Sequence, residues 1–224
     1  MARGIEGSAS EQAFATESPS CKPAPSGEPL ELFTRAVPPI GIDRPGCQRP
    51  ELLASLRSRL GLEAVGGRRV YAVIDGAIGL ELAMRVKHQA GCRLFTLFEG
   101  ARARDAAQAG PILVEPPDDP SAFLGCWVDA AGAHLGVLVV AYSKRVELTA
   151  HLRHIFVVTS ESSQQFFFRF YDPRVLPRFV ATCSAQERTD LFGPVRAFIV
   201  ETAVGGSDEF ETLASGAADA AAGR

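Results

Sequence analysis

The sequence predicts an α/β fold: a single layered domain with a mixed central β-sheet flanked by helices. Three observations predict it. Helix and strand patterns alternate along the chain, which is typical of helices packed on a sheet. Residues 70–74 and 135–141 are continuously apolar, as in strands that are buried on both faces. Residues 155–158 and 164–171 are spaced as a hairpin, so at least one antiparallel pair is expected among the strands.

Composition and charge narrow the class of protein. Of 224 residues, 46% are hydrophobic, which is enough for a sizeable core, and the net charge is -3. A mildly acidic chain lacks the basic stripe of a nucleic-acid-binding protein. No apolar run reaches the roughly 20 residues of a membrane-spanning helix, and the first residues lack the pattern of a signal peptide. We therefore expect a cytoplasmic protein, with no nucleic-acid partner and no membrane insertion.

The two ends of the chain differ from the body. Residues 1–49 are rich in proline and have few clustered apolar residues, so they predict a mostly disordered arm. Within the arm, residues 30–33 (LELF) are a candidate docking segment for the body or a partner. Residues 205–224 are rich in glycine and alanine and predict a short flexible tail. The α/β domain is expected to span residues 50–204.

The first half of the body predicts alternating helices and strands. Pro50 suits the first position of a helix that Gly61 ends. The strand at 70–74 leads into an Asp75–Gly76 turn, and Asp119 is placed to cap a helix that begins at Pro120. The other elements expected here are helix 78–89, strand 93–98, a weak helix at 101–108, strand 111–115 and strand 135–141.

The sequence of the second half of the body predicts the hairpin of residues 155–171, with helices before and after it. Ser143 is placed to cap a helix with an apolar face. Asp172 and Pro173 suit the start of another helix. Ser184 and Glu187 have the spacing of a capping box, and a last strand is expected at 195–200.

The common catalytic and cofactor motifs are missing from the sequence. It has no nucleotide-binding glycine loop, no GxSxG and no HExxH. The five cysteines form no CxxC pair, which favours reduced, mostly buried thiols. His151 and His154 are spaced to share a metal ion, but no third ligand can be identified. We expect neither a cofactor nor a metal.

Arg169 is the most informative charged residue. It is expected in the middle of a strand between aromatic residues, where its charge must be paired. The candidate partners are Asp75, Asp172 and Glu99, and Arg153 and Arg174 are placed to join the same network. A buried ion-pair framework is favoured over a catalytic centre.

Six motifs occur in a characteristic order. They are YAVIDGA (71–77), LFEG (97–100), GPILV (110–114), HLR (151–153), FRFYDPRVL (168–176) and LFGP (191–194). This ordered set, over about residues 70–194, resembles the adaptor-chaperone family of bacterial type VI secretion known as domain of unknown function 4123. The resemblance implies a cytoplasmic adaptor without enzymatic activity, which binds a toxic effector and promotes its loading onto the spike protein VgrG.

The resemblance also implies roles for individual residues. Asp75, Arg169 and Asp172 are expected to hold the framework, and Tyr171, Arg174, His151 and Arg153 to reach the partner. Glu99, Phe192 and Gly193 complete the set of family residues. Pro177 departs from the family pattern. A proline inside the helix expected there would remove a backbone hydrogen bond and bend the helix.

Two alternatives stay open at this point. One is a hydrolase that uses Asp75, His151 and Asp172. The other is a small-molecule-sensing domain with its pocket near Arg169.

Overall fold

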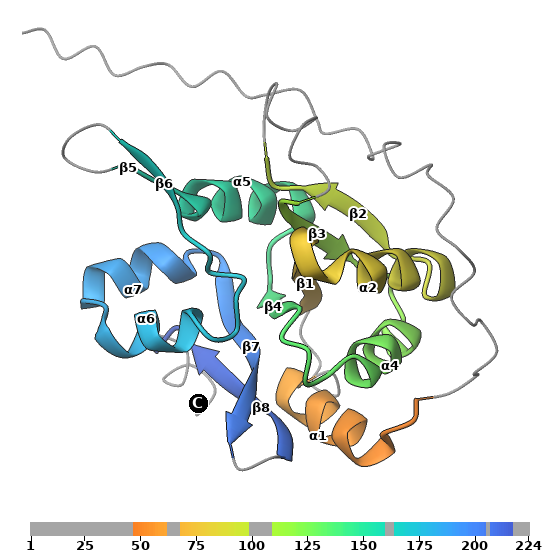
Figure 1. The fold of residues 1–224 in the computed structure, drawn as a ribbon. Coiled ribbons are helices and arrows are strands. Elements are labelled where there is room, and N and C mark those ends of the chain that lie inside the picture. The colour runs from red at the N-terminus through yellow and green to blue at the C-terminus, as the bar shows by residue number, and fades with distance from the viewer. Residues whose placement is uncertain (1–46, 62–67, 99–108, 160–163, 205–206, 217–224) are drawn as a thin grey trace, which may run out of the picture.

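The computed structural model describes residues 47–61, 68–98, 109–159, 164–204 and 207–216. Within these ranges the chain forms six helices, a six-stranded sheet and a separate two-stranded hairpin (Figure 1). The expected α/β class is confirmed. Most of the expected arm, Glu99, the helix at 101–108 and the last residues of the expected tail lie outside the described residues.

Helices and strands alternate along most of the chain. In order they are α1 (Pro50–Leu60), β1 (Arg69–Asp75), α2 (Gly76–Gln89), β2 (Arg93–Thr96), β3 (Pro111–Glu115), α4 (Ser121–Asp129), β4 (Gly136–Ala141), α5 (Arg145–Phe156), β5 (Val157–Thr159), β6 (Gln165–Phe167), α6 (Leu176–Thr182), α7 (Ala185–Phe192), β7 (Val195–Val204) and β8 (Ser207–Ala214). In the described part of the chain, no helix combines the length and the apolar character needed to cross a membrane.

The large sheet has the strand order β2-β3-β1-β4-β7-β8. Each described pair of neighbours is antiparallel, whereas we expected a mixed sheet. The reason is topological. β1 and β2 run in the same direction on either side of α2, but β3 lies between them, and β1 likewise lies between β3 and β4. This is the split β-α-β arrangement of ferredoxin-like folds.

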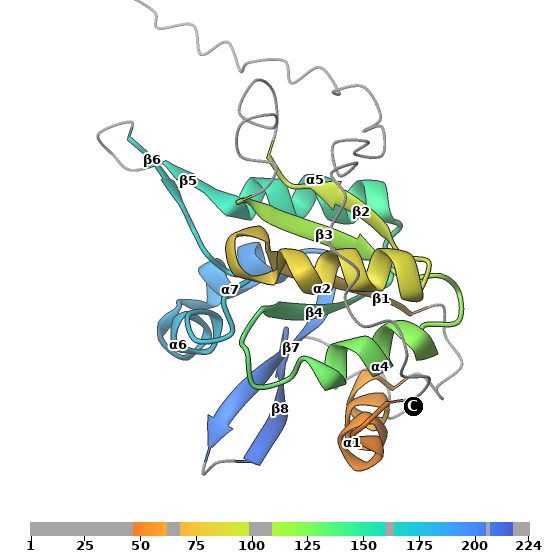
Figure 2. The same ribbon diagram turned by 45° about the vertical axis from the view of Figure 1, so that its right-hand side comes forward.

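Helices cover both faces of the sheet. Alternate side chains of a strand point to opposite faces, so β1 sends Ala72 and Ile74 into one core and Tyr71 and Val73 into the other. The first core is closed by α1, α2 and α4, and the second by α5, α6 and α7. The helices lie on the two sides of the sheet in Figure 2. Burial on both sides explains the continuously apolar strands.

Several expected helix ends are confirmed. Pro50 begins α1, and Gly61 follows it in the left-handed conformation at φ 59°. Asp119 Oδ1 accepts a hydrogen bond from the Ser121 amide (2.9 Å), although α4 begins at Ser121 with Pro120 as its N-cap, one residue later than expected. The expected capping box of α7 is complete, since the Ser184 and Glu187 side chains each accept from the other's backbone amide.

Other expected starts are wrong. The Ser143 side chain does not cap α5, whose N-cap is Lys144. That helix continues to Phe156, so the hairpin strands are shorter than expected. The next helix, α6, begins at Leu176 and not at Asp172. Pro177 therefore lies in the first turn, where the missing amide leaves no intrahelical bond unmade, and the expected bend has no basis.

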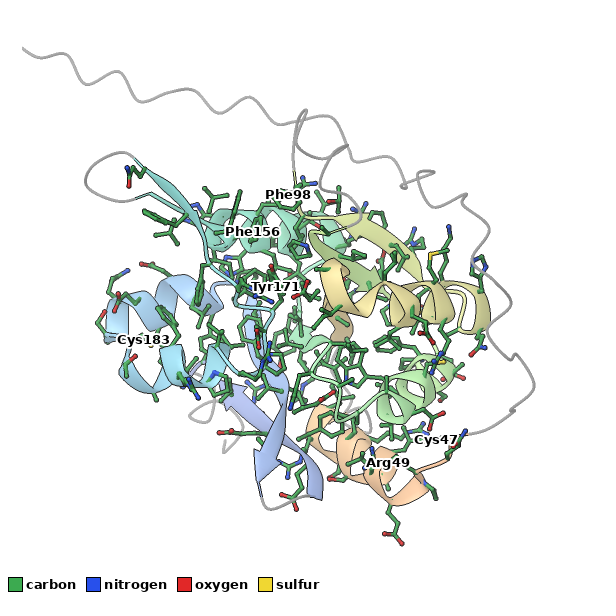
Figure 3. All side chains as sticks on the ribbon, in the orientation of Figure 1. Cys47, Arg49, Phe98, Phe156, Tyr171 and Cys183 are labelled. Atoms are coloured by element: carbon green, nitrogen blue, oxygen red, sulfur yellow. The ribbon has the colours of Figure 1, made fainter. Side chains whose placement is uncertain are left out.

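Both ends of the described chain are more ordered than the sequence predicts. Residues 47–49 of the expected arm are bound to the end of α4: the Gln48 amide donates to Asp129 Oδ1 (2.9 Å), and Arg49 Nη1 donates to the Ala131 carbonyl (3.4 Å) (Figure 3). Within the expected tail, residues 207–214 form β8. This strand pairs with β7 and buries Phe210 and Leu213.

Candidate functional site

Asp75 lies at the centre of the fold, where β1 ends and α2 begins. Its carboxylate is buried, and Oδ1 accepts a hydrogen bond from the Ala77 amide (3.0 Å), which caps α2. Oδ2 accepts from Arg169 Nη2 at 2.6 Å. One side chain therefore fixes the start of a helix and holds a segment from the other half of the domain.

Asp172 forms the second half of the same cluster. Its carboxylate is also buried, and it accepts hydrogen bonds from the backbone amide, Nε and Nη2 of Arg174 at 2.8–2.9 Å. Arg169 Nη2 lies 3.5 Å from its Oδ2. The hydrogen bonds from Arg174, opposed by partial burial, lower the pKa of Asp172, so the carboxylate is kept ionised.

These four residues form what we call the Asp–Arg network: Asp75, Arg169, Asp172 and Arg174. Its two carboxylates are buried, whereas the side chains of Arg169 and Arg174 are 49% and 58% exposed. Two positive charges thus balance two negative ones, which removes the cost of burying an unpaired carboxylate. Of the three candidate partners of Arg169, Asp75 and Asp172 lie within ion-pair distance of it, and Glu99 lies outside the described residues.

The location of Arg169 differs from the expectation. Strand β6 ends at Phe167, so Arg169 lies beyond the strand and is half-exposed. The described hydrogen bond of Arg153 is made elsewhere: its Nη2 donates to the Thr96 carbonyl (3.1 Å) and ties α5 to the end of β2.

Tyr171 was expected to reach the partner, but it is buried. The guanidinium of Arg169 lies 5.8 Å from the centre of its ring. Burial, with the charge of Asp75 acting in the same direction, raises the pKa of Tyr171. Its position inside the second core makes it a packing residue beneath the network (Figure 3).

His151 lies in a second cluster, formed with the LFGP motif. Its Nε2 lies 2.9 Å from the Leu191 carbonyl. Its ring also lies against Gly193, which has φ +43°, and a Cβ there would be 2.5 Å from His151 Cε1. Phe192 is buried, with its ring 5.4 Å from that of Phe198. The histidine and the glycine therefore fit each other, and both conformation and space require glycine at 193.

The hydrolase alternative needs His151 beside a carboxylate. Among the hydrogen bonds of the described residues, neither Asp75 nor Asp172 is bonded to His151; each pairs with arginine instead. Likewise, no three His, Cys, Asp or Glu side chains of the described segments are grouped so that they could hold a metal ion.

One buried acid was missed by the sequence reasoning. Glu201 on β7 is buried, and its Oε2 accepts from the amides of Gly132 and His134 (3.1 and 3.0 Å). It also lies 3.3 Å from His134 Nδ1. Glu201 thereby holds the turn before β4, where His134 has φ +53°. A single acid among the mostly apolar residues 195–204 (VRAFIVETAV) was the available signal.

The structure is an α/β domain in which the charged residues of two motifs, YAVIDGA and FRFYDPRVL, pair with one another in the Asp–Arg network. Comparison with protein families agrees with the ordered motifs: the family described as domain of unknown function (DUF4123) matches residues 70–190. The chain belongs to this family. Neither the curated proteins nor the solved structures include a significant match.

Proposed function

We propose that this protein is a cytoplasmic adaptor that binds a type VI secretion effector and promotes its loading onto the VgrG spike, without catalysis. Membership of the family supports the proposal, because the resemblance described above associates that family with type VI secretion. The single observation that carries the non-catalytic part is the Asp–Arg network. Asp75 and Asp172 each accept structural hydrogen bonds on both carboxylate oxygens.

Such a network supports a scaffold role for a physical reason. A general acid or base needs a pKa near the operating pH and access to the substrate. The pKa of Asp172 is lowered by Arg174, and Asp75 is buried beneath Arg169. Both features favour carboxylates that hold the fold together. An adaptor requires a stable body with an exposed docking surface.

The experiment takes as candidate effectors the proteins encoded next to the gene of this chain. Each candidate is co-expressed and co-purified with this chain, and secretion of the effector is measured in cells with and without the adaptor. We expect a stable complex and a loss of secretion without the adaptor. An effector that is equally soluble and equally secreted without this chain would contradict the proposal.

The enzyme alternative is tested on the purified protein. Asp75→Asn and His151→Ala should lower stability or effector binding if these residues have structural roles. A hydrolase would instead lose turnover with an unchanged melting temperature. Finding such turnover, abolished by either substitution in a folded protein, would replace the adaptor hypothesis with the enzyme.

A further inference from the structure

Arginine residues gather at one end of the large sheet. Arg69 begins β1, Arg93 begins β2, and Arg196 is the second residue of β7. The register aligns them across the sheet, because Arg93 is opposite the last residue of β3, Arg69 is opposite the last residue of β4, and that residue is opposite the first residue of β7. Since β1 has 7 residues, this row lies about 20 Å from Asp75, at the end of the sheet opposite the Asp–Arg network.

One carboxylate faces three of the guanidinium groups at this end. Glu115 lies on β3, between β1 and β2. Its Oε2 is 2.7 Å from Nη2 of Arg93 and 3.5 Å from Nε of Arg145, the first residue of α5. Arg69 points to the same face of the sheet as Glu115, since each lies two residues from a residue of the second core on its own strand. Among the described residues Arg69 forms no ion pair, so this group keeps an excess of positive charge.

Further cations extend this positive surface around Tyr142, which directly follows β4 and is 53% exposed. The hydrogen bond from Arg68 lowers the pKa of Tyr142, and the charges of Arg68 and Arg196 act in the same direction. Lys144, the N-cap of α5, is exposed. None of these three cations forms an ion pair with a described residue. We call the whole set the arginine surface: Arg68, Arg69, Arg93, Lys144, Arg145 and Arg196.

The acids within this surface are fewer than its cations. On the elements that carry the arginine surface, the described acids at this end are Glu115 and the exposed Glu147 in the first turn of α5. Six cations thus face two acids, an excess of four. Glu63, which lies outside the described residues, would reduce the excess only to three.

Acids on neighbouring elements have counter-charges of their own. Asp118 and Asp119, in the loop after β3, are matched by Arg57 and Arg59 in the last turn of α1, where Arg57 donates to the first residue of α4. On α7, Arg188 matches Asp190, and the carboxylate of Glu187 is held in the capping box. These acids therefore do not cancel the excess on the arginine surface.

We propose that the arginine surface, together with Tyr142, is the docking surface for an acidic segment of the effector. This inference rests on the proposed function and names the surface and the chemistry of the partner. Cations without carboxylate partners attract a segment of opposite charge and fix its position. Tyrosine and arginine are enriched in the cores of protein interfaces, and Tyr142 and the 64% exposed Val146 supply apolar contact. The net charge of -3 favours a protein partner over a nucleic acid.

The first test measures binding of the co-purified candidate effector to full-length variants by titration calorimetry. We expect Arg69→Glu to raise the dissociation constant about threefold or more, and its combination with Lys144→Glu to raise it about tenfold or more. An acid at the N-terminus of α5 is compatible with the helix dipole. The matched control is Arg178→Glu, because Arg178 on α6 is also exposed and forms no described ion pair; it should leave the constant within about twofold. An effect of Arg178→Glu equal to that of Arg69→Glu would overturn the proposal.

The second test changes the salt concentration. Between about 0.1 M and 1 M salt the Debye length falls from about 10 Å to about 3 Å, so attraction between exposed charges is screened. The difference in affinity between the wild type and the Arg69→Glu/Lys144→Glu variant should therefore shrink at high salt. A difference of the same size at both concentrations would contradict recognition by charge.

The outcomes separate the two proposals. If no protein encoded next to the gene binds the wild-type chain, the proposed function is wrong, and the docking surface is wrong with it. If the wild type binds a candidate and the double variant binds it equally well while remaining folded by circular dichroism, only the docking surface is wrong.

Crosslinking identifies the occupant and does not depend on the charge-reversal variants. A photoreactive phenylalanine in place of Tyr142 should crosslink to a segment of the effector that is rich in aspartate and glutamate. The same group in place of Ile78, which is 52% exposed in the first turn of α2, should not. A crosslink from position 142 to a segment without acids, to the spike protein, to a second copy of this chain or to nucleic acid would overturn the proposal.

Discussion

Arg169 Nη2 lies 2.6 Å from Asp75 Oδ2, although the two residues are 94 positions apart in the chain. The bond joins the start of α2 to the segment that follows β6. It is the connection through which the YAVIDGA and FRFYDPRVL motifs act together. The first motif supplies a buried carboxylate, and the second supplies the half-exposed guanidinium that offsets the cost of burying it.

Asp75→Asn tests this connection. The amide oxygen still caps α2, but the negative charge facing Arg169 is lost. We expect the free energy of unfolding, measured in urea, to fall by about 1–3 kcal/mol. Asp119→Asn is the matched control, because Asp119 also accepts an amide at a helix start but is exposed; it should change stability by less than about 0.5 kcal/mol. Equal effects would show that the ion pair adds nothing.

Gly193→Ala tests the fit between Gly193 and His151. Gly91→Ala is its control, because Gly91 also has a positive φ (+66°) but has no neighbouring atom within 4 Å of the added Cβ. We expect backbone strain on the order of 1–3 kcal/mol in both variants, with the larger cost at Gly193, whose φ 43° and ψ -116° lie outside the left-handed helical region. Gly193→Ala should lose roughly a further 1–3 kcal/mol to the clash with the imidazole ring.

A double-mutant cycle separates the two contributions at position 193. Adding His151→Ala to Gly193→Ala should restore the stability lost to the clash but not the stability lost to backbone strain. The measurement is urea unfolding of the wild type, both single variants and the double variant. Strict additivity would mean that the two residues do not interact.

The stability of the protein should depend on pH through His151. Burial lowers the pKa of this histidine below 6.5; the bond to the Leu191 carbonyl opposes the shift, and His154 adds to it. Since the unfolded chain then binds the proton more readily, this contribution to stability is complete above pH 6.5 and is lost as the pH falls from there toward the folded-state pKa. The slope for one proton is at most about 1.4 kcal/mol per pH unit.

The variant His151→Gln checks the assignment. Unfolding in urea between about pH 5.5 and 7.5, where histidine titrates, should show a smaller slope for this variant than for the wild type. The exposed His88 provides the control, His88→Gln, whose slope should match that of the wild type. A wild-type slope retained in His151→Gln would assign the dependence to another group.

Phe210→Ala tests whether the last strand belongs to the core. Phe210 is 3% exposed and packs in the first core, so its truncation should cost about 3–5 kcal/mol of unfolding free energy. Glu211→Ala, at an exposed position of the same strand, should cost less than about 0.5 kcal/mol. If Phe210→Ala had a negligible effect on thermal unfolding, residues 207–214 would not contribute to the core and would behave as the flexible tail that the composition predicts.

Local features of the fold could be predicted where neighbouring residues decide the structure. The Pro50 start, the Gly61 end and the Ser184–Glu187 capping box depend only on residues within one turn, and continuous apolar runs gave the central strands. Asp75 could be named as one of three candidate partners of Arg169, because a charge placed among aromatic residues must be paired.

Features that depend on distant segments could not be predicted. Strand direction is set by which strand lies between two others, and no local pattern encodes that β3 separates β1 from β2. Tyr171 was expected to reach the partner because the family resemblance implied it, yet its ring is buried in the second core. Strand β8 was missed because alanine and glycine dominate its surroundings. The Gly205–Gly206 pair between two strand patterns was the hairpin signal that outweighs composition.

The position of β1 between β3 and β4 limits how this domain can be divided. Both neighbours of the central strand come later in the chain, so a ribosome must release residues through Ala141 before both edges of β1 are covered. Fragments that stop earlier would display an apolar strand with unsatisfied backbone groups, which invites aggregation. Expression of shorter pieces should therefore keep residues 69–141 intact.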